Sequence, residues 1–111
     1  MRGQRDEIPP GTLDMLILKT LSAGGEMHGF QIADSIQQAS RDVLQVEEGS
    51  LYPALQRMLL QGWIKGEWGR TDENRRARYY RITADGKKRL ERELEQYERV
   101  ARAIARVLQP A

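Results

Sequence analysis

The chain has 111 residues, which suits a single small domain, and charged residues make up 31% of it while the formal net charge is only +2. It contains no cysteine and one histidine, which excludes disulfides, thiolate metal sites and catalytic sites built from several histidines. We therefore expect no metal, no cofactor and no enzymatic activity, and we expect a chain of this size to form a homodimer.

The first eleven residues predict an N-terminal tail. They are charged or proline-bearing, end in Pro9-Pro10-Gly11, and contain no apolar stretch of signal-peptide length. The longest apolar run, residues 13–21, is interrupted by Asp14 and Lys19, so we expect no membrane-spanning helix. These features predict a cytoplasmic protein.

Two helices are expected after the tail, over residues 13–21 and 28–39. Thr12 is the expected cap of the first helix, and Gly24-Gly25 its end. This helix has apolar residues on two faces, so it should pack on two neighbours. At the start of the second helix, His28 is expected to fasten the helix rather than to act as a sensor.

A very short strand over residues 44–46 precedes a third helix, which is expected from Ser50 to Gly62. With Ser50 as the cap, Pro53 falls in the first turn, where backbone N–H groups have no intrahelical partner to lose. Steps of 100° per residue place an apolar face inward and leave an outer face that is free to meet a ligand. The inward residues are Leu51, Ala54, Leu55, Met58, Leu59 and Gly62, and the outer ones are Gly49, Ser50, Pro53, Gln56 and Arg57.

Two alternating segments, residues 63–68 and 78–82, predict a pair of strands. The connection between them, residues 69–77, is too long for a tight hairpin. From Lys65 to Arg81 there are six basic and three acidic residues, a local excess of three positive charges. The hairpin is therefore expected to be a basic arm.

Thr83 is the expected cap of a last helix that runs to about Leu108. Along it, apolar residues recur with alternating steps of four and three, which is typical of a coiled-coil seam. The seam is Leu90, Leu94, Tyr97, Ala101, Ile104 and Leu108. Because the helix outruns so small a domain, we expect the seam to join two copies, with Met15 and Leu18 contributing, although a strip in one chain's own core has the same pattern. Met15, Leu18 and Tyr97 could also line an effector cavity at that interface, although plain packing is the simpler explanation.

The order of these elements predicts a mainly α fold with a small β-hairpin. It is that of a winged helix-turn-helix, in which the hairpin is the wing, with a dimerisation helix added. The expected organisation is a tail over 1–11, a DNA-binding domain over 12–83 and a dimerisation helix over 84–111.

Several segments together resemble the PadR family of bacterial transcriptional regulators. They are His28-Gly29-Phe30-Gln31-Ile32-Ala33, Gly49-Ser50-Leu51-Tyr52-Pro53-Ala54-Leu55, Gly62-Trp63-Ile64 and Arg76-Ala77-Arg78-Tyr79-Tyr80-Arg81-Ile82-Thr83-Ala84-Asp85-Gly86. The match runs over about residues 12–90, with Phe30 where tyrosine is usual. The resemblance implies a dimeric winged-helix repressor that binds operator DNA through its third helix and wing, and many members are released by small molecules. With a single C-terminal helix, the chain is similar to the short members of the family, whereas longer members carry a whole C-terminal domain.

The residues expected to contact DNA come from the start of the third helix, its outer face and the hairpin. Taken alone, such residues are better explained by helix capping, packing and a solvated charged face. Because the helix residues match the family motif beside a basic hairpin, we interpret Ser50 as a phosphate contact, and Tyr52 and Pro53 as contacts to the DNA backbone or a thymine methyl. The hairpin lies beside this helix, so we interpret its arginines as phosphate or minor-groove contacts. Gln56 and Arg57 are candidate readers of adenine and guanine, although a phosphate contact or a local salt bridge also fits them. The full set is Ser50, Tyr52, Pro53, Gln56, Arg57, Lys65, Arg75, Arg76 and Arg78.

These observations predict a sequence-specific transcriptional regulator whose partners are double-stranded DNA and a second copy of the chain; the family resemblance adds a possible small-molecule effector. In a homodimeric repressor, the two third helices would enter successive major grooves about 34 Å apart, so the operator would be palindromic. The rival hypothesis is an adaptor that uses the winged-helix shape to bind protein and does not bind DNA. The basic hairpin favours the regulator.

Overall fold

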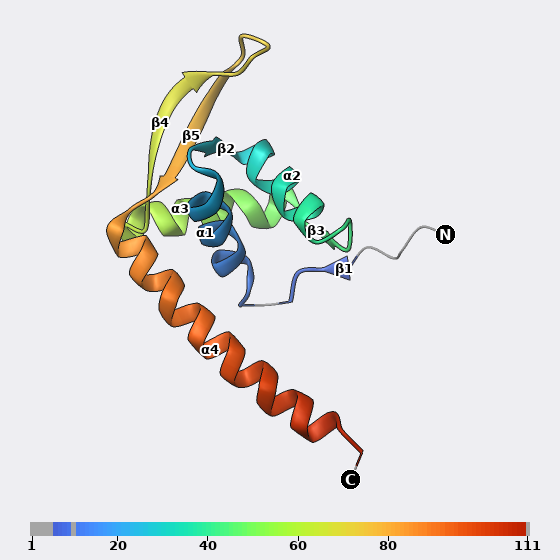
Figure 1. Ribbon diagram of the computed structural model, residues 1–111. Coiled ribbons are helices and arrows are strands. Elements are labelled where there is room, and N and C mark those ends of the chain that lie inside the picture. Colours follow the sequence, from blue (N-terminus) through green and yellow to red (C-terminus); the bar gives the residue numbers. More distant parts are fainter. Residues whose placement is uncertain (1–5, 10, 111) are drawn as a thin grey trace.

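The computed structural model describes residues 6–9 and 11–110. The elements are β1 (Asp6–Glu7), α1 (Leu13–Gly24), β2 (Met27–His28), α2 (Gly29–Ala39), β3 (Leu44–Gln45), α3 (Glu48–Gln61), β4 (Ile64–Arg70), β5 (Arg76–Ile82) and α4 (Ala84–Leu108). In Figure 1, α1, α2 and α3 form the body, the β4–β5 hairpin projects from one side of it, and α4 runs away on the other. The structure confirms the predicted fold class, a winged helix-turn-helix with a long C-terminal helix.

The wing is longer, and its loop shorter, than the sequence predicted. β4 and β5 pair in antiparallel register from Ile64 opposite Ile82 to Arg70 opposite Arg76, which leaves only residues 71–75 as the loop. Pairing continues through Gly69, and the Tyr79 ring lies close above this glycine, where a Cβ would come within 3.1 Å of the ring. Thus a glycine that read as loop is a strand residue in close contact with an aromatic ring.

The very short strand predicted at residues 44–46 is β3, whereas β1 and β2, which also have two residues each, were not predicted. β2 adds to the wing sheet beside β5, with Met27 opposite Tyr80. β1 pairs in parallel with β3, and the Asp6 amide donates to the Val43 carbonyl at 2.7 Å. Part of the expected tail is therefore attached to the segment before α3, while residues 1–5 and Pro10 of that tail lie outside the described residues.

Helix ends follow side-chain capping at two of the expected positions. The His28 Nδ1 accepts from the Gln31 amide at 3.3 Å, and the Gln31 Oε1 accepts from the His28 amide at 3.1 Å, a reciprocal capping box. Thr83 Oγ1 accepts from the Gly86 amide at 3.0 Å at the start of α4. These bonds confirm the predicted structural role of His28 and the predicted cap at Thr83.

The expected cap at Thr12 is only partly correct. Thr12 precedes α1, but its hydroxyl donates to the Pro9 carbonyl at 2.7 Å and makes no cap hydrogen bond to the helix. The proline turn before the helix offers that acceptor at short range. α1 ends at Gly24 and is capped by Gly25 with φ 80°, which confirms the predicted end at Gly24-Gly25.

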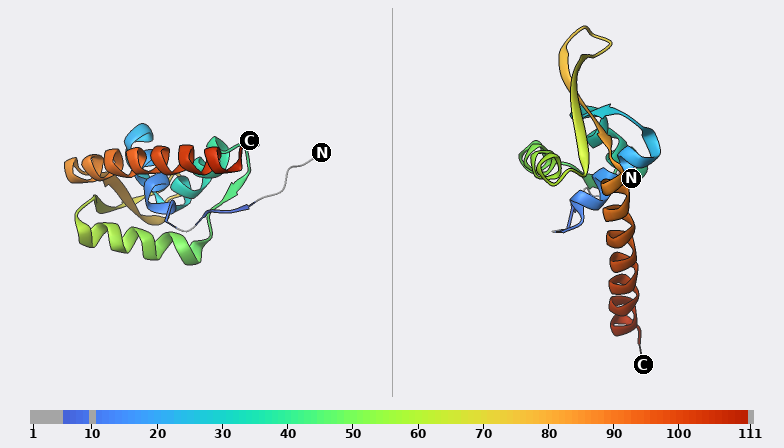
Figure 2. Two further views of the ribbon diagram at one scale, coloured as in Figure 1. Left: turned by 90° about the horizontal axis from the view of Figure 1, so that it is seen from below. Right: turned by 90° about the vertical axis from the view of Figure 1, so that its left-hand side faces the viewer.

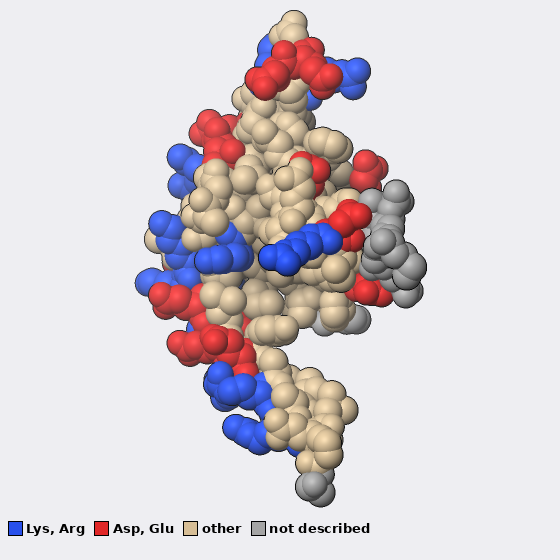
Figure 3. Space-filling view, turned by 45° about the vertical axis from the view of Figure 1, so that its right-hand side comes forward, with Lys and Arg blue, Asp and Glu red and all other residues tan. Residues whose placement is uncertain are grey.

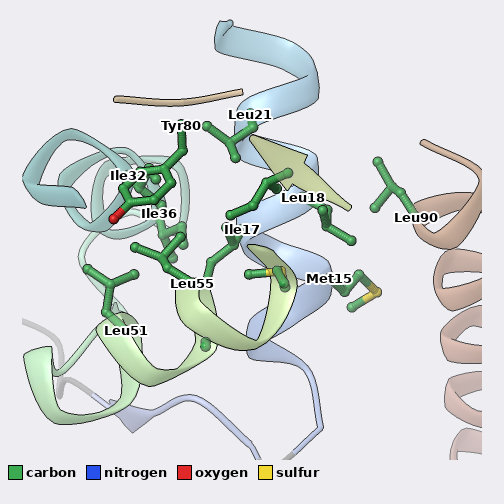
Figure 4. Close-up of a cluster of buried hydrophobic side chains, with 13 residues drawn as sticks. Met15, Ile17, Leu18, Leu21, Ile32, Ile36, Leu51, Leu55, Tyr80 and Leu90 are labelled. Atoms are coloured by element: carbon green, nitrogen blue, oxygen red, sulfur yellow. The ribbon is translucent and has the colours of Figure 1, made fainter. Parts of the chain in front are cut away.

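The core lies between α1, α2, α3 and the base of the wing (Figure 4). Its buried residues are Met15, Ile17, Leu18, Leu21, Ile32, Ile36, Leu51, Ala54, Leu55, Met58, Ile64, Tyr80 and Leu90. Figure 2 shows α3 and α4 on opposite sides of α1, which explains why α1 is apolar on two faces. Each buried leucine-sized side chain contributes about 1.5–3 kcal/mol to the hydrophobic stabilisation of the domain.

This arrangement corrects the assignment of Met15 and Leu18 to a dimer interface. Leu18 has no exposed surface in the single chain and Met15 only 6%, because Leu90 of α4 packs against this side of α1 (Figure 4). A side chain with no exposed area has none to bury against a partner. Both residues therefore serve the core of their own chain.

Candidate DNA-binding interface

The outer face of α3 is exposed as predicted, but the helix begins earlier than expected. α3 starts at Glu48 with Glu47 as its N-cap, so Ser50 is the third helical residue and not the cap. Pro53 therefore lies in the second turn, where it cannot donate to the Gly49 carbonyl four residues before it. That carbonyl lies on the same exposed face, where the missing bond leaves acceptor capacity for water or a ligand.

The start of α3 contains acidic residues next to Ser50, the predicted phosphate contact. Glu47 and Glu48 are both exposed beside Ser50. Acidic side chains at a helix N-terminus offset the positive end of the helix dipole. They weaken the attraction of this helix start for a phosphate.

Tyr52 both packs against α2 and remains partly exposed, so packing and ligand contact are both open to it. A Cβ on Gly29 would lie 2.8 Å from the Tyr52 hydroxyl oxygen and 3.0 Å from its Cε1, so the tyrosine ring packs directly on the first turn of α2. The side chain is nevertheless 45% exposed. It links α2 to α3 while presenting part of its ring to the space under the wing.

A cleft of about 720 Å³ separates the wing from the starts of α2 and α3. It brings together five of the nine residues predicted to contact DNA, namely Tyr52, Gln56, Arg75, Arg76 and Arg78. Further lining residues are His28, Gly29, Phe30, Trp68, Thr71, Glu73, Ala77 and Tyr80. The cleft thus joins a polar position of α3 to three arginines of the wing across an aromatic floor.

The other four predicted residues lie elsewhere. Ser50 lines a separate hollow of about 330 Å³ beside the β1 segment, and Pro53 is exposed outside both hollows. Lys65 stands opposite Arg81 at the base of the wing. Arg57 Nη2 lies 2.6 Å from Asp14 Oδ1 on α1, so the salt-bridge alternative for this residue is realised in the free chain.

The wing tip is mixed in charge. Figure 3 shows acidic and basic side chains together at the end of the hairpin, where Asp72 and Glu73 accompany the arginines. Arg70 is held locally, because its Nη1 donates to the Asn74 carbonyl at 3.2 Å. The positive charge that faces the cleft therefore comes from Arg75, Arg76 and Arg78.

Tyr80 lies at the inner end of the cleft, opposite Gly66 in the sheet. Burial raises the pKa of its hydroxyl above the ordinary value of 10.0, while the nearby Arg78 charge acts in the opposite direction. The raised pKa extends to higher pH the range in which the hydroxyl is neutral and able to donate a hydrogen bond.

Two aromatic residues of the cleft were not expected from the sequence. Trp68 is 61% exposed and Phe30 is 74% exposed, and both line the space under the wing. The alternation of β4 places Trp68 on the same face as Ile64, but Ile64 is buried at the base while the wing carries Trp68 beyond the body. Ile64 is buried and Trp68 is exposed because the wing is long, and the sequence predicted a shorter wing.

Together, the helix order, the exposed face of α3 and the adjoining basic wing define a winged-helix protein of the DNA-binding class. Residues 17–92 match the transcriptional regulator PadR-like family, and the chain belongs to that family. Its members are transcriptional regulators and not enzymes. Within the described residues, no helix is both long and apolar enough to span a bilayer.

Individual relatives agree with this assignment. The chain is 31% identical over 83 residues to an uncharacterized protein from Lysinibacillus sphaericus, which is 75% of each chain. A transcriptional regulator from Clostridium thermocellum superposes with a TM-score of 0.81 at 29% identity, covering 89% of this chain and 95% of that one. A PadR-like transcriptional regulator from Bacillus cereus gives 0.75 at 28% identity over 91% and 95%.

One similar structure contains DNA. The Bacillus subtilis PadR in complex with operator DNA superposes with a TM-score of 0.66 at 23% identity. The match covers 78% of this chain but only 48% of that protein. At this identity the likeness establishes the shared fold.

Proposed function

We propose that the protein is a homodimeric repressor that binds a palindromic operator through α3 and the wing. The observation that carries this proposal is the cleft in which Tyr52 and Gln56 of α3 face Arg75, Arg76 and Arg78. A polar helix face beside a basic arm suits a duplex, because the helix can enter a groove while the arm neutralises phosphates next to it. The Bacillus subtilis PadR, which shares this fold, is in complex with operator DNA, and this supports DNA as the proposed ligand.

Within this interface, Gln56 is the proposed base reader of α3. It is exposed, lines the cleft, and carries the amide that pairs with both N6 and N7 of adenine. Arg76 and Arg78 are the proposed contacts to phosphate or the minor groove. Arg57 can contact DNA only after its ion pair with Asp14 breaks. Because the Arg57 side chain is 60% exposed, breaking this ion pair costs little free energy.

A second copy of the chain is the proposed occupant of the apolar strip on α4. Leu90 is buried and Leu94 half-buried against the chain's own core, while the C-terminal part of the helix is exposed. The exposed apolar residues are Tyr97, Val100, Ile104, Val107 and Leu108. Figure 3 shows this uncharged surface on one side of α4 and the charged residues on the other. Such an amphipathic helix end buries its strip by pairing with an equivalent helix.

Repression and release by a small molecule complete the proposal. A hollow of about 260 Å³ between the start of α1 and α4 is lined by Met15 and Tyr97, together with Gly11, Thr12, Glu93, Gln96 and Val100. A molecule bound there would change how α4 sits on the body, and α4 sets the spacing between the two wings of a dimer. This position supports an effector site that acts through dimer geometry.

Two substitutions test the contact assignment. Gln56→Ala should change the order of preference among duplex sequences, while Arg76→Ala should weaken binding to all sequences alike and reduce the salt slope by about 0.9. Arg92→Ala removes an exposed arginine of α4 and is the matched control, which should leave both properties unchanged. Parental affinity and preference in both test variants would refute the proposed interface.

A further inference from the structure

The wing carries an unusual arrangement in which two arginines share one aromatic ring. The Arg76 Cζ lies 4.2 Å from the centre of the Trp68 ring, and the Arg78 Cζ lies 5.9 Å from it. Trp68 stands directly opposite Arg78 in the sheet, and Arg76 is two residues further along β5 on the same face. The three side chains therefore form one cluster on the cleft side of the wing.

The sheet leaves room for this cluster at one glycine. A Cβ on Gly66 would lie 2.6 Å from the Arg78 Nε, so Arg78 lies flat across the β4 backbone where any other residue would displace it. Within the described part of the chain, that Nε is buried without a hydrogen-bond acceptor. The Arg78 guanidinium therefore lies between the Gly66 backbone and the Trp68 ring.

We propose that Trp68 is a positioning residue for DNA binding, which holds the guanidinium groups of Arg76 and Arg78 ready for the duplex. The inference rests on the proposed function of the wing. A guanidinium stacked on an indole keeps its N–H donors in its own plane, where they stay free to meet phosphate or base edges. Stacking also restricts a flexible side chain before binding, which lowers the entropy that the complex must offset.

A positioning role differs measurably from a charge contact. Trp68→Leu removes the aromatic face and leaves both arginines, so the number of neutralised phosphates and the salt slope should stay the same. Affinity should fall by roughly 3- to 10-fold, the range expected for a cation–π contact at a partly exposed site. Trp68→Phe keeps an aromatic face and should recover most of the loss. Glu67→Leu, on the opposite face of β4, is the matched control.

The decisive experiment is a double-mutant cycle with duplex DNA. In a background of Arg76→Ala and Arg78→Ala, Trp68→Leu should have no further effect, because the groups that it positions are gone. An equal loss in both backgrounds would overturn the inference and make Trp68 a direct DNA contact. Unchanged affinity of Trp68→Leu in the parental background would overturn it as well.

A measurement without DNA keeps this inference separate from the proposed function. In NMR spectra of the free protein, the Arg76 and Arg78 side-chain protons should show ring-current shifts that vanish in Trp68→Leu and persist in Trp68→Phe. Absence of these shifts in the parent refutes the cluster, whatever the protein binds. If the shifts are present but the protein binds no duplex at low salt, the cluster exists, while the proposed function and the role of Trp68 in DNA binding are both refuted.

Discussion

Gly86 is the tightest point in the junction between the wing and α4, so its replacement by alanine is a strong test of the packing. A Cβ at this position would lie 2.1 Å from the Trp63 carbonyl oxygen and 2.8 Å from Ile82 Cγ1. The Gly86 amide also donates the bond that caps α4 at Thr83, and the Thr83 hydroxyl donates to the Gly62 carbonyl at 2.7 Å. The closer clash is with a backbone atom, the Trp63 carbonyl oxygen, so rotation of a side chain cannot relieve the clash.

The expected cost follows from these contacts. Overpacking a rigid site costs about 1–3 kcal/mol, and weakening the cap costs about 1 kcal/mol. The higher helix propensity of alanine offsets up to about 1 kcal/mol of this sum. The free energy of unfolding should therefore fall by about 1–3 kcal/mol, which lowers Tm by roughly 4–12 °C in a chain of this size.

Urea and thermal denaturation at one fixed protein concentration measure this effect. The matched control is Gly49→Ala, which also lies in the first turn of a helix but would meet no atom within 4 Å. It should leave stability unchanged or raise it by up to about 1 kcal/mol. Equal stabilities of the Gly86→Ala and Gly49→Ala variants would refute the close packing of α4 against the wing.

Three further substitutions probe the charge pair, the buried tyrosine and the dimer helix. Asp14→Asn should cost at most about 1 kcal/mol of stability, and by freeing Arg57 it should raise duplex affinity; unchanged affinity would place Arg57 outside the interface. The pKa of Tyr80 is raised by burial, so the stability due to its neutral hydroxyl is complete below pH 10.0 and lost above it. Tyr80→Phe should therefore flatten the alkaline fall in unfolding free energy, and equal slopes would contradict the raised pKa. Ile104→Glu should yield monomers in light scattering, while Arg102→Glu, on the other side of α4, should stay dimeric; a dimeric Ile104→Glu variant would contradict the proposed seam.

Features that depend on neighbouring residues were predictable from the sequence. The capping of α2 by His28 and of α4 by Thr83 involves bonds that span three residues. The inward face of α3 follows from helical periodicity, and Leu51, Ala54, Leu55 and Met58 are buried as predicted. Leu59 is only half-buried and Gly62 is exposed, because Gly62 ends the helix with φ 77° at the turn into the wing.

Features that depend on distant partners could not be predicted in this way. β1 consists of two charged residues and has no strand pattern, so its pairing with β3, the short strand that the sequence did predict, could not be foreseen. The start of α3 at Glu48 comes from the path of the chain after β3, whereas Ser50 was the better cap by residue type alone. The Arg57–Asp14 pair spans 43 positions, and the stacking of Arg76 on Trp68 requires the register of the hairpin. The sequence therefore predicted which residues could form the site, but only the structure shows that five of the nine line one cleft and the other four lie elsewhere.

Binding of the protein to a random duplex library, measured across a salt series with sequencing of the retained DNA, tests the central claim most directly. Our account predicts a palindromic consensus with half-sites about one helical turn apart and an affinity that falls steeply as salt rises. Stable dimers that retain no duplex even at low salt would contradict it and favour a winged-helix adaptor that binds protein.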